Sequence, residues 1–336
     1  MFIVENYALA VILCIITMLC WGSWGNTQKL AAKTWRYELF YWDYVIGIVL
    51  LALVVGFTLG SHGDQGRGFV EDLSQVSSSN FWSAFVGGVI FNAANILLAT
   101  SISLAGMAVA FPVGVGIALV LGVIVNYIGA PKGDPIILFL GVALIVVAVI
   151  FNGMAAGKMS KSDESQKSGK KGLIIAIFAG ILMSLFYRFV ASAMDLDNFH
   201  SPTPGMVTPY SAFFIFSLGI LASNFLFNTY VMRKPFVGEP VTYKQYFAGG
   251  FSTHMVGVLG GAIWAIGTAF SYIAAGKAGA AISYALGQGA PMIAAFWGVF
   301  IWKEFKGGNK SVNTLLAFMF IFFIIGLGMI VVAGNN

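Results

Sequence analysis

Charge is scarce in this sequence. Only 9% of its 336 residues are Asp, Glu, Lys or Arg, whereas a soluble protein carries about 25%. The composition is instead 59% hydrophobic, and the mean hydropathy is +0.88. Apolar runs of about 20 residues follow one another, as in helices that cross a bilayer. We therefore predict an all-α integral membrane protein.

Cysteine and histidine are also scarce. Cys14 and Cys20 lie in one expected helix, so they cannot join two elements, and no metal-ligand spacing occurs. The histidines, His62, His200 and His254, make no catalytic cluster with acidic residues, and no phosphate-binding loop is present. An enzyme, a cofactor, a metal site and ATP-driven pumping are therefore not expected. The basic residues sit in loops between spans, so the pI near 9.1 does not indicate a nucleic-acid partner.

Ten membrane spans are predicted. The first lacks a basic leader and a cleavage site, so we expect it to be retained. Five spans precede a polar loop at 155–171 and five follow it, so the second half must cross the membrane in the opposite sense. The expected domains are a first five-helix repeat at 1–154, a linker at 155–171 and a second repeat at 172–336. The spans lie at about 7–27, 38–60, 81–101, 106–129, 135–153, 172–194, 209–232, 246–274, 278–302 and 312–333.

One stretch of the chain recurs. A shift of 173 positions places 85–127 on 258–300 without a gap, and five glycines coincide. Repeated halves of this kind are typical of secondary transporters, in which the substrate site lies between the halves. The coincident glycines are Gly87, Gly88, Gly106, Gly114 and Gly116, which fall on Gly260, Gly261, Gly279, Gly287 and Gly289.

The loops carry an asymmetric charge. Fourteen Lys and Arg residues lie on the side that includes the 155–171 loop, and three, Arg67, Lys132 and Lys277, lie on the other. Because basic loops stay in the cytoplasm, we predict a multi-pass protein of the plasma (inner) membrane with both termini outside. The linker's basic residues also suit contact with anionic lipid.

Candidate substrate-binding residues fall in four spans. Trp21, Trp24 and Gln28 share a helix face, which suits a sugar or heterocycle, although an interfacial aromatic belt has the same pattern. Asn92 and Asn95 are amides inside the membrane that serve either a polar solute or interhelical bonding. Further candidates are Trp264 and Thr268 in the second copy, and Gln288 in a span interrupted by Gly and Pro, which matches the interrupted Phe111–Gly116 stretch.

Four ionisable or polar residues are candidates for other roles. Asp43 lies about 7 Å inside its span and His254 lies within another, so both are candidates for proton coupling. A first-turn acid and a structural histidine are the alternatives. Tyr187 and Arg188 lie far along their span, near the outer surface, where Arg188 reaches either Asp195 and Asp197 or the substrate; a direct pair with Asp43 is not expected.

These residues resemble a known family. WGSWGNTQKL at the end of the first span, WDY in the second, the glycine-rich repeated helices and the basic central loop are similar to the ureide permeases. That group, with the glucose/ribose porters and the rhamnose–proton symporter, belongs to the drug/metabolite transporter superfamily. The resemblance implies ten spans, outside termini and uptake of a small polar solute, usually driven by protons. Plant members carry allantoin, uracil and related ureides, and bacterial neighbours carry sugars.

The resemblance leaves alternatives open. A multidrug or metabolite exporter of the same superfamily would need an apolar cavity with a membrane carboxylate, and the Asn and Gln content favours a polar solute instead. The central loop is shorter than that expected of plant ureide permeases, so sugar and ureide or nucleobase both stand as substrates. The sequence does not specify the oligomeric state.

Overall fold

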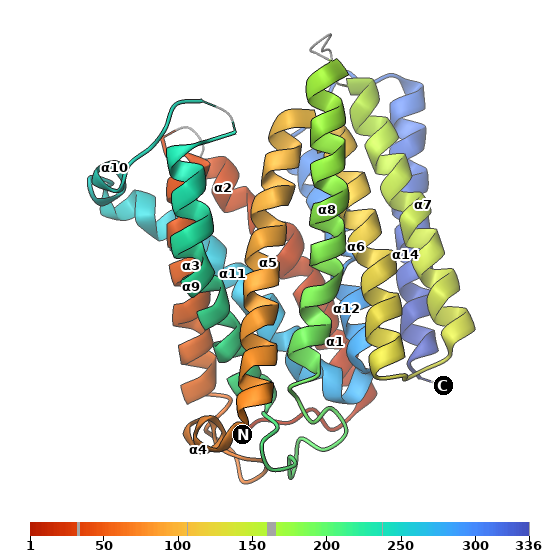
Figure 1. The fold of residues 1–336 in the computed structure, drawn as a ribbon. Helices are drawn as coiled ribbons and strands as arrows, with labels where there is room; N and C mark the ends of the chain where they lie inside the picture. The colour runs from red at the N-terminus through yellow and green to blue at the C-terminus, as the bar shows by residue number, and fades with distance from the viewer. Residues whose placement is uncertain (32–33, 106, 160–165, 237, 336) are drawn as a thin grey trace.

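Long helices run side by side through the whole molecule (Figure 1). The structure, a computed structural model, describes residues 1–31, 34–105, 107–159, 166–236 and 238–335, and no β-strand forms within these ranges. The helices are α1 Tyr7–Ser23, α2 Gly25–Ala31, α3 Tyr37–Phe57, α4 Phe69–Gln75, α5 Ser78–Ala105, α6 Met107–Gly129, α7 Pro135–Met159, α8 Gln166–Ala191, α9 Pro209–Arg233, α10 Tyr243–Phe247, α11 Phe251–Ala278, α12 Ala280–Gly287, α13 Ala290–Phe296, the π-helix η1 Trp297–Ile301 and α14 Lys310–Ala333.

Most of these helices match an expected span. Among the described residues, nine helical segments are long and apolar enough to cross a membrane, which confirms an all-helical integral membrane protein. In α6 the described apolar part, Val113–Gly129, is shorter than the other nine. The short helices α4 and α10 were not predicted, because each spans fewer than two turns and gives no periodic signal.

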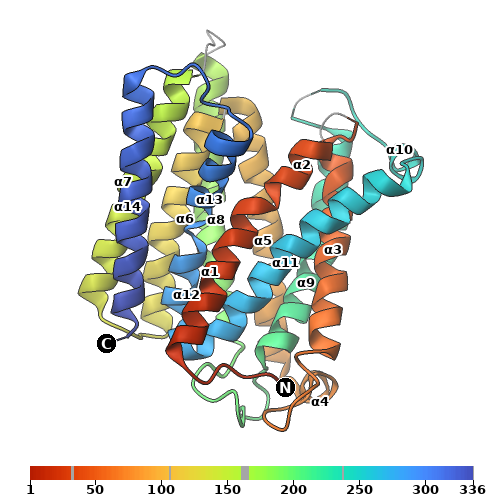
Figure 2. The same ribbon diagram turned by 180° about the vertical axis from the view of Figure 1, so that it is seen from behind.

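The bundle has two distinct ends. Figures 1 and 2 place the N-terminus, α4 and the C-terminus at one end, called here the α4 end. At the opposite end, called the α10 end, lie α2, α10, the last residues of α7 and the first residues of α8. Helix α7 continues to Met159 and α8 begins at Gln166, so the described part of the expected 155–171 linker is helical. Residues 160–165 lie outside the described residues.

Glycines allow the central helices to cross closely. Helix α5 packs on α8 and α9, while α11 packs on α1 and α3. A Cβ at Gly88 of α5 would lie 2.1 Å from the Phe216 carbonyl oxygen of α9, and one at Gly261 of α11 would lie 1.9 Å from the Tyr44 carbonyl oxygen of α3. Small residues at a crossing let two backbones approach and gain van der Waals contact, which drives helix association in lipid.

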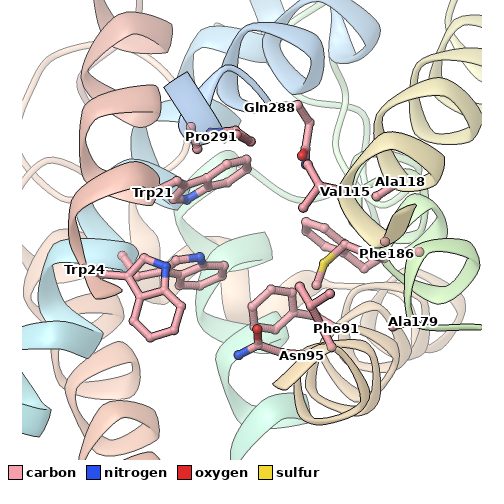
Figure 3. A pocket seen from close by; sticks show the side chains of 16 residues that line it. Trp21, Trp24, Phe91, Asn95, Val115, Ala118, Ala179, Phe186, Gln288 and Pro291 are labelled. Atoms are coloured by element: carbon pink, nitrogen blue, oxygen red, sulfur yellow. The ribbon is translucent and has the colours of Figure 1, made fainter. Parts of the chain in front are cut away.

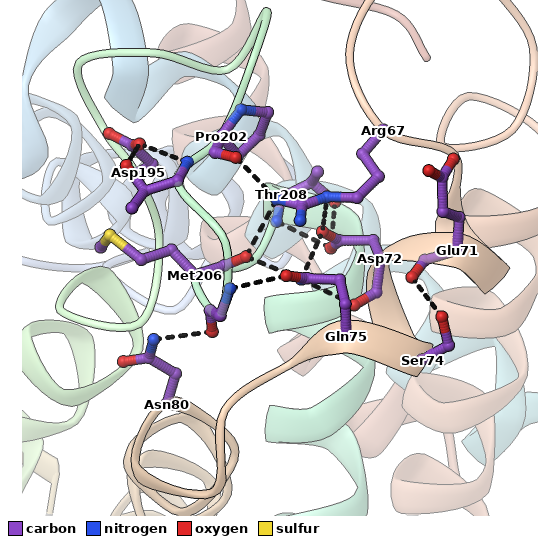
Figure 4. Close-up of polar contacts among 12 residues, drawn as sticks. Arg67, Glu71, Asp72, Ser74, Gln75, Asn80, Asp195, Pro202, Met206 and Thr208 are labelled. Carbon is purple, nitrogen blue, oxygen red and sulfur yellow. Dashed lines mark hydrogen bonds and ion pairs between the residues drawn. The ribbon is translucent and has the colours of Figure 1, made fainter.

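A buried ion pair fastens two connecting segments at the α4 end (Figure 4). Arg67 Nε lies 3.0 Å from Asp72 Oδ1, and Asp72 is fully buried. The other carboxylate oxygen accepts hydrogen bonds from the Thr208 amide (2.8 Å) and hydroxyl (2.9 Å). Burial raises the pKa of Asp72, although the bonds from Thr208 and the charge on Arg67 act in the opposite direction. This tie joins α4 to the start of α9 across 136 positions of sequence.

Candidate functional site

A cavity lies between the long helices and reaches the surface at the α10 end. Its inner part, the deep pocket, has a volume of about 130 Å³ and is lined from α1, α5, α6, α8, α11 and α13 (Figure 3). Its wider part, the vestibule, has a volume of about 620 Å³ and ends at Lys29 and Glu304, an ion pair whose side chains are 44% and 49% exposed. Trp21, Trp24 and Asn95 line both parts.

Aromatic rings form the walls of the deep pocket. The indoles of Trp21 and Trp264 are stacked, with centroids 6.1 Å apart and an interplanar angle of 12°. Phe91 lies against Trp264 at a centroid distance of 4.5 Å. The indole N–H of Trp21 donates to the Thr268 hydroxyl at 3.1 Å, which fixes the orientation of the ring. Flat apolar walls of this kind suit the faces of a heterocycle or a sugar ring.

Two amides supply the polar groups of the deep pocket. Asn95 donates through Nδ2 to the Tyr41 hydroxyl at 3.1 Å, and Figure 3 shows its side chain directed into the pocket together with that of Gln288. Among the described residues, neither the side-chain oxygen Oδ1 of Asn95 nor the side-chain amide of Gln288 has a hydrogen-bond partner. Both therefore have hydrogen-bonding capacity for a solute or for water. None of the described residues that line the deep pocket is charged.

Gln288 owes its position to a break in the helix. It caps α12, and α13 begins two residues later, with Pro291 near its start. The expected matching interruption differs, since α6 runs as one helix from Met107 to Gly129. Pro112 stands in the second turn of α6, where the missing N–H removes one backbone bond without ending the helix.

The remaining predicted binding residues lie apart from the deep pocket. Gln28 lines the vestibule. Asn92 is fully buried behind the wall, where its Oδ1 accepts from the Tyr41 hydroxyl at 2.9 Å and its Nδ2 donates to the Ser223 hydroxyl at 2.9 Å. Thr268 is also fully buried and serves to hold Trp21. Asn92 thus links α3, α5 and α9 by hydrogen bonds, which is the interhelical role considered above as the alternative to solute binding.

The two candidates for proton coupling are in direct contact. His254 Nδ1 lies 2.8 Å from Asp43 Oδ1, although 211 positions separate them in sequence. Asp43 also accepts from the Tyr246 hydroxyl at 2.7 Å and from the Trp35 indole N–H at 3.0 Å. Burial and the bond to Asp43 raise the pKa of Tyr246, so this phenol stays protonated as a donor. His254 keeps 23% of its side chain exposed, whereas Asp43 keeps 2%.

Tyr187 and Arg188 point to different surroundings. The Tyr187 side chain is fully buried, and its hydroxyl donates to the Ser271 carbonyl oxygen at 3.1 Å. Arg188 packs on α6, where a Cβ at Gly129 would come within 2.2 Å of the guanidinium. Among the described residues, no ion pair joins Arg188 to Asp43 or to Asp195.

Several residues of the site gave no signal in the sequence. Phe186 lines the deep pocket but stands in an apolar span where aromatic residues are common. Tyr41 holds Asn95, and its position beside other aromatic residues of α3 does not distinguish it. Trp35 and Tyr246 lie outside the expected spans or at their ends, so only tertiary structure reveals that they meet at Asp43.

Known proteins resemble the chain along its full length. The family model described as ureide permease matches residues 40–171 and 165–333. Ureide permease 1 of Arabidopsis thaliana is 23% identical over the whole of both chains. The glucose uptake protein GlcU of Bacillus subtilis (strain 168) is 24% identical over 93% of this chain and 94% of its own. A crystal structure that is 15% identical aligns over 96% of both chains with a TM-score of 0.62, which shows a shared fold.

Proposed function

Because the chain belongs to the ureide permease family, a family of multi-pass membrane transporters for small solutes, we propose that it takes up a neutral polar solute by proton-coupled alternating access. The observation that carries the proposal is the deep pocket, whose described lining is uncharged and whose aromatic walls flank the side-chain oxygen of Asn95 and the amide of Gln288. Amides donate and accept together, as the carbonyl and N–H groups of a ureide or the hydroxyls of a sugar require. The relatives named for ureides and for glucose support both classes of solute.

The site belongs between two halves of ten helices in all, with α6 as the tenth span. Helices α5 and α11 have bounds that coincide after the 173-position shift, and α5 starts at the α4 end while α11 starts at the α10 end (Figures 1 and 2). Their partners correspond as well, since α8 and α9 stand to α5 as α1 and α3 stand to α11. This correspondence supports two five-helix repeats of opposite orientation, 1–154 and 172–336, joined by 155–171.

The α10 end faces the cytoplasm in this proposal, and both termini lie outside a plasma (inner) membrane. The Lys and Arg bias of the loops supports that orientation. The vestibule then opens toward the cytoplasm, and the structure corresponds to the state that releases solute after uptake. Trp24 lines both the deep pocket and the vestibule, and Gln28 lines the vestibule, so both meet the solute as it leaves.

The Asp43–His254 pair is the proposed site of proton coupling. It lies at the α3–α11 crossing, where a Cβ at Gly257 would come within 2.4 Å of Asp43 Cβ. Two turns further along, α11 carries Trp264 into the deep pocket. A proton gained or lost at the pair changes the charge at this crossing and so biases the movement of α11.

Uptake by proteoliposomes tests the function. Purified protein is reconstituted and supplied with radiolabelled allantoin, uracil or glucose under an inward proton gradient. Accumulation of one compound, lost in the Asn95→Ala, Gln288→Ala double variant, is the expected result. If none of the three accumulates and none raises the melting temperature of the detergent-purified protein, then allantoin, uracil and glucose are not its solutes, and the proposed solute classes lose their support.

A further inference from the structure

Buried hydroxyl groups separate the deep pocket from the α4 end. Helix α11 enters from the α10 end, so the residues after Trp264 lie beyond the pocket. Helix α8 runs in the same direction, and its residues after Met183 and Phe186 lie beyond the pocket too. Five fully buried side chains at this level carry hydroxyl groups, and we call this set the tyrosine plug: Tyr187, Ser271, Tyr272, Ser283 and Tyr284.

The members of the tyrosine plug are linked across three helices. The hydroxyls of Tyr187 and Ser271 lie 3.0 Å apart, and those of Ser271 and Ser283 also lie 3.0 Å apart. The Tyr187 ring meets the rings of Tyr272 and Tyr284 at centroid distances of 5.1 and 5.4 Å. The plug therefore joins α8 of one side of the cavity to α11 and α12.

Tyr284, which we call the floor, lies behind two residues that line the deep pocket. Its hydroxyl donates to the carbonyl oxygens of Ala118 at 3.0 Å and Met183 at 3.4 Å, and both of these residues line the pocket. Its ring rests on α6 at Gly122, where a Cβ would lie 2.3 Å from the ring. The floor therefore depends on a tyrosine that only glycine at position 122 accommodates.

One buried hydroxyl of the tyrosine plug has no partner. Within the described residues, the Tyr272 hydroxyl makes no hydrogen bond, although its ring is fully buried. A buried polar group without a partner destabilises a structure, because it gives up hydrogen bonds to water and makes none in return. Apolar side chains would seal a membrane bundle without that penalty, so hydroxyls at this level indicate a surface that is wet in another conformation.

We propose that the tyrosine plug is the closed gate at the α4 end, and that its hydroxyls line the passage when the site opens there. The inference rests on the proposed transport function. An alternating-access transporter holds one end closed while the other is open, and here the vestibule opens at the α10 end. Opening separates α12 from α6 and α8, breaks the bonds of Tyr284, and exposes to water or solute the hydroxyls of Tyr187, Tyr272 and Ser283.

The native thiol of Cys14 can measure opening of the gate, because it lies beside the tyrosine plug and no plug residue has to be changed to label it. Its side chain is fully buried on α1, with Sγ 3.6 Å from the Ser283 hydroxyl. In a chain that carries Cys20→Ala, a charged, membrane-impermeant methanethiosulfonate is applied to one membrane face at a time. The exposed Ser201, changed to Cys in a parallel sample that also lacks Cys14, identifies the face that is the α4 end.

Two variants are designed to loosen the gate by different means. Tyr284→Phe removes both hydrogen bonds of the floor, and Gly122→Ala pushes the Tyr284 ring away. We expect each to speed Cys14 labelling from the α4 end at least tenfold, with little labelling from the α10 end. Gly116→Ala is the matched control on α6, because no atom lies within 4 Å of a Cβ there, and its labelling rate should not change.

The labelling rates can refute the proposed gate independently of the proposed solute site. Labelling of Cys14 only from the α10 end, or unchanged rates in both loosened variants with near-normal melting temperatures, refutes it. Should both variants fail to fold, Tyr187→Phe keeps the ring and removes only its bonds to Ser271, and it must then raise the rate. The labelling needs no substrate, so failure of the solute-uptake experiment is recognised separately.

Discussion

The rings of Phe91 and Trp264 touch in the wall of the deep pocket, with centroids 4.5 Å apart. The two residues occupy the same position in the two copies of the repeated stretch, which lie 173 positions apart. When two halves are related by a rotation, equivalent residues meet only near its axis. This contact therefore supports a pocket placed on the axis between the halves, where either end of the molecule can open to it.

Replacing a glycine by alanine at the helix crossings should destabilise the protein to a similar extent in both halves. Gly88→Ala and Gly261→Ala each place a Cβ about 2 Å from a backbone carbonyl oxygen, of Phe216 and Tyr44 respectively. Because the backbone must move apart, we expect each to lower stability by about 1–3 kcal/mol or more. Melting temperatures in detergent check this. Gly328→Ala on α14 is the control, since nothing lies within 4 Å of its Cβ, and a similar fall there would contradict the packing argument.

The three amides that were predicted to bind solute should separate into two classes. Asn95→Ala and Gln288→Ala should each weaken solute binding by about 1–3 kcal/mol with little change in melting temperature, because both face the deep pocket. Asn92→Ala should lower the melting temperature instead, because it removes the buried hydrogen bonds that join Asn92 to Tyr41 and Ser223. Thermal-shift titration with the solute that accumulates in proteoliposomes measures both quantities. Normal affinity in Asn95→Ala and Gln288→Ala would remove them from the binding site.

The ion pair at the α4 end should matter more to stability than the one at the vestibule. Asp72→Ala leaves the mostly buried Arg67 without its counter-charge, so a loss of about 3–5 kcal/mol is expected. Lys29→Ala breaks a pair whose side chains are both more than 40% exposed, and should change stability by less than about 1 kcal/mol. Melting temperatures of the two variants are compared. Equal losses of stability would mean that burial does not determine how much these two ion pairs contribute to stability.

The orientation is tested by two exposed positions at opposite ends. In a chain without Cys14 and Cys20, Ser201→Cys at the α4 end should react with an impermeant thiol reagent on intact cells. Lys306→Cys at the α10 end should react only after the membrane is opened, because the basic loops are predicted to be cytoplasmic. Reaction of both cysteines after permeabilisation controls for accessibility. The reverse pattern would invert the topology and turn the vestibule to the outside.

The sequence predicted the span positions well, because apolar length in a bilayer leaves little choice of structure. Helices α5 and α11 begin and end within a few residues of the expected spans. The sequence did not distinguish the two asparagines of α5. Periodicity places Asn92 and Asn95 on one helix face, but it cannot show that Asn92 is hydrogen-bonded to Tyr41 and Ser223. The pairing of Asp43 with His254 was also out of reach, since it depends on how α3 crosses α11.

Proton coupling at Asp43 gives the last prediction. Asp43→Asn keeps one side-chain oxygen, which can still accept from Tyr246 but not also from Trp35, whose N–H reaches the other carboxylate oxygen. We therefore expect the variant to fold with a lower melting temperature, but its amide cannot exchange a proton at neutral pH. We expect proteoliposomes with this variant to exchange solute across the membrane and to lose accumulation under a proton gradient. A protonophore should abolish accumulation by the unmodified protein. The control is Glu38→Gln, an acid of the same helix that pairs with Arg36 and does not contact His254. Accumulation that persists in Asp43→Asn would place the coupling elsewhere, and accumulation that persists with the protonophore would exclude protons as the driving ion.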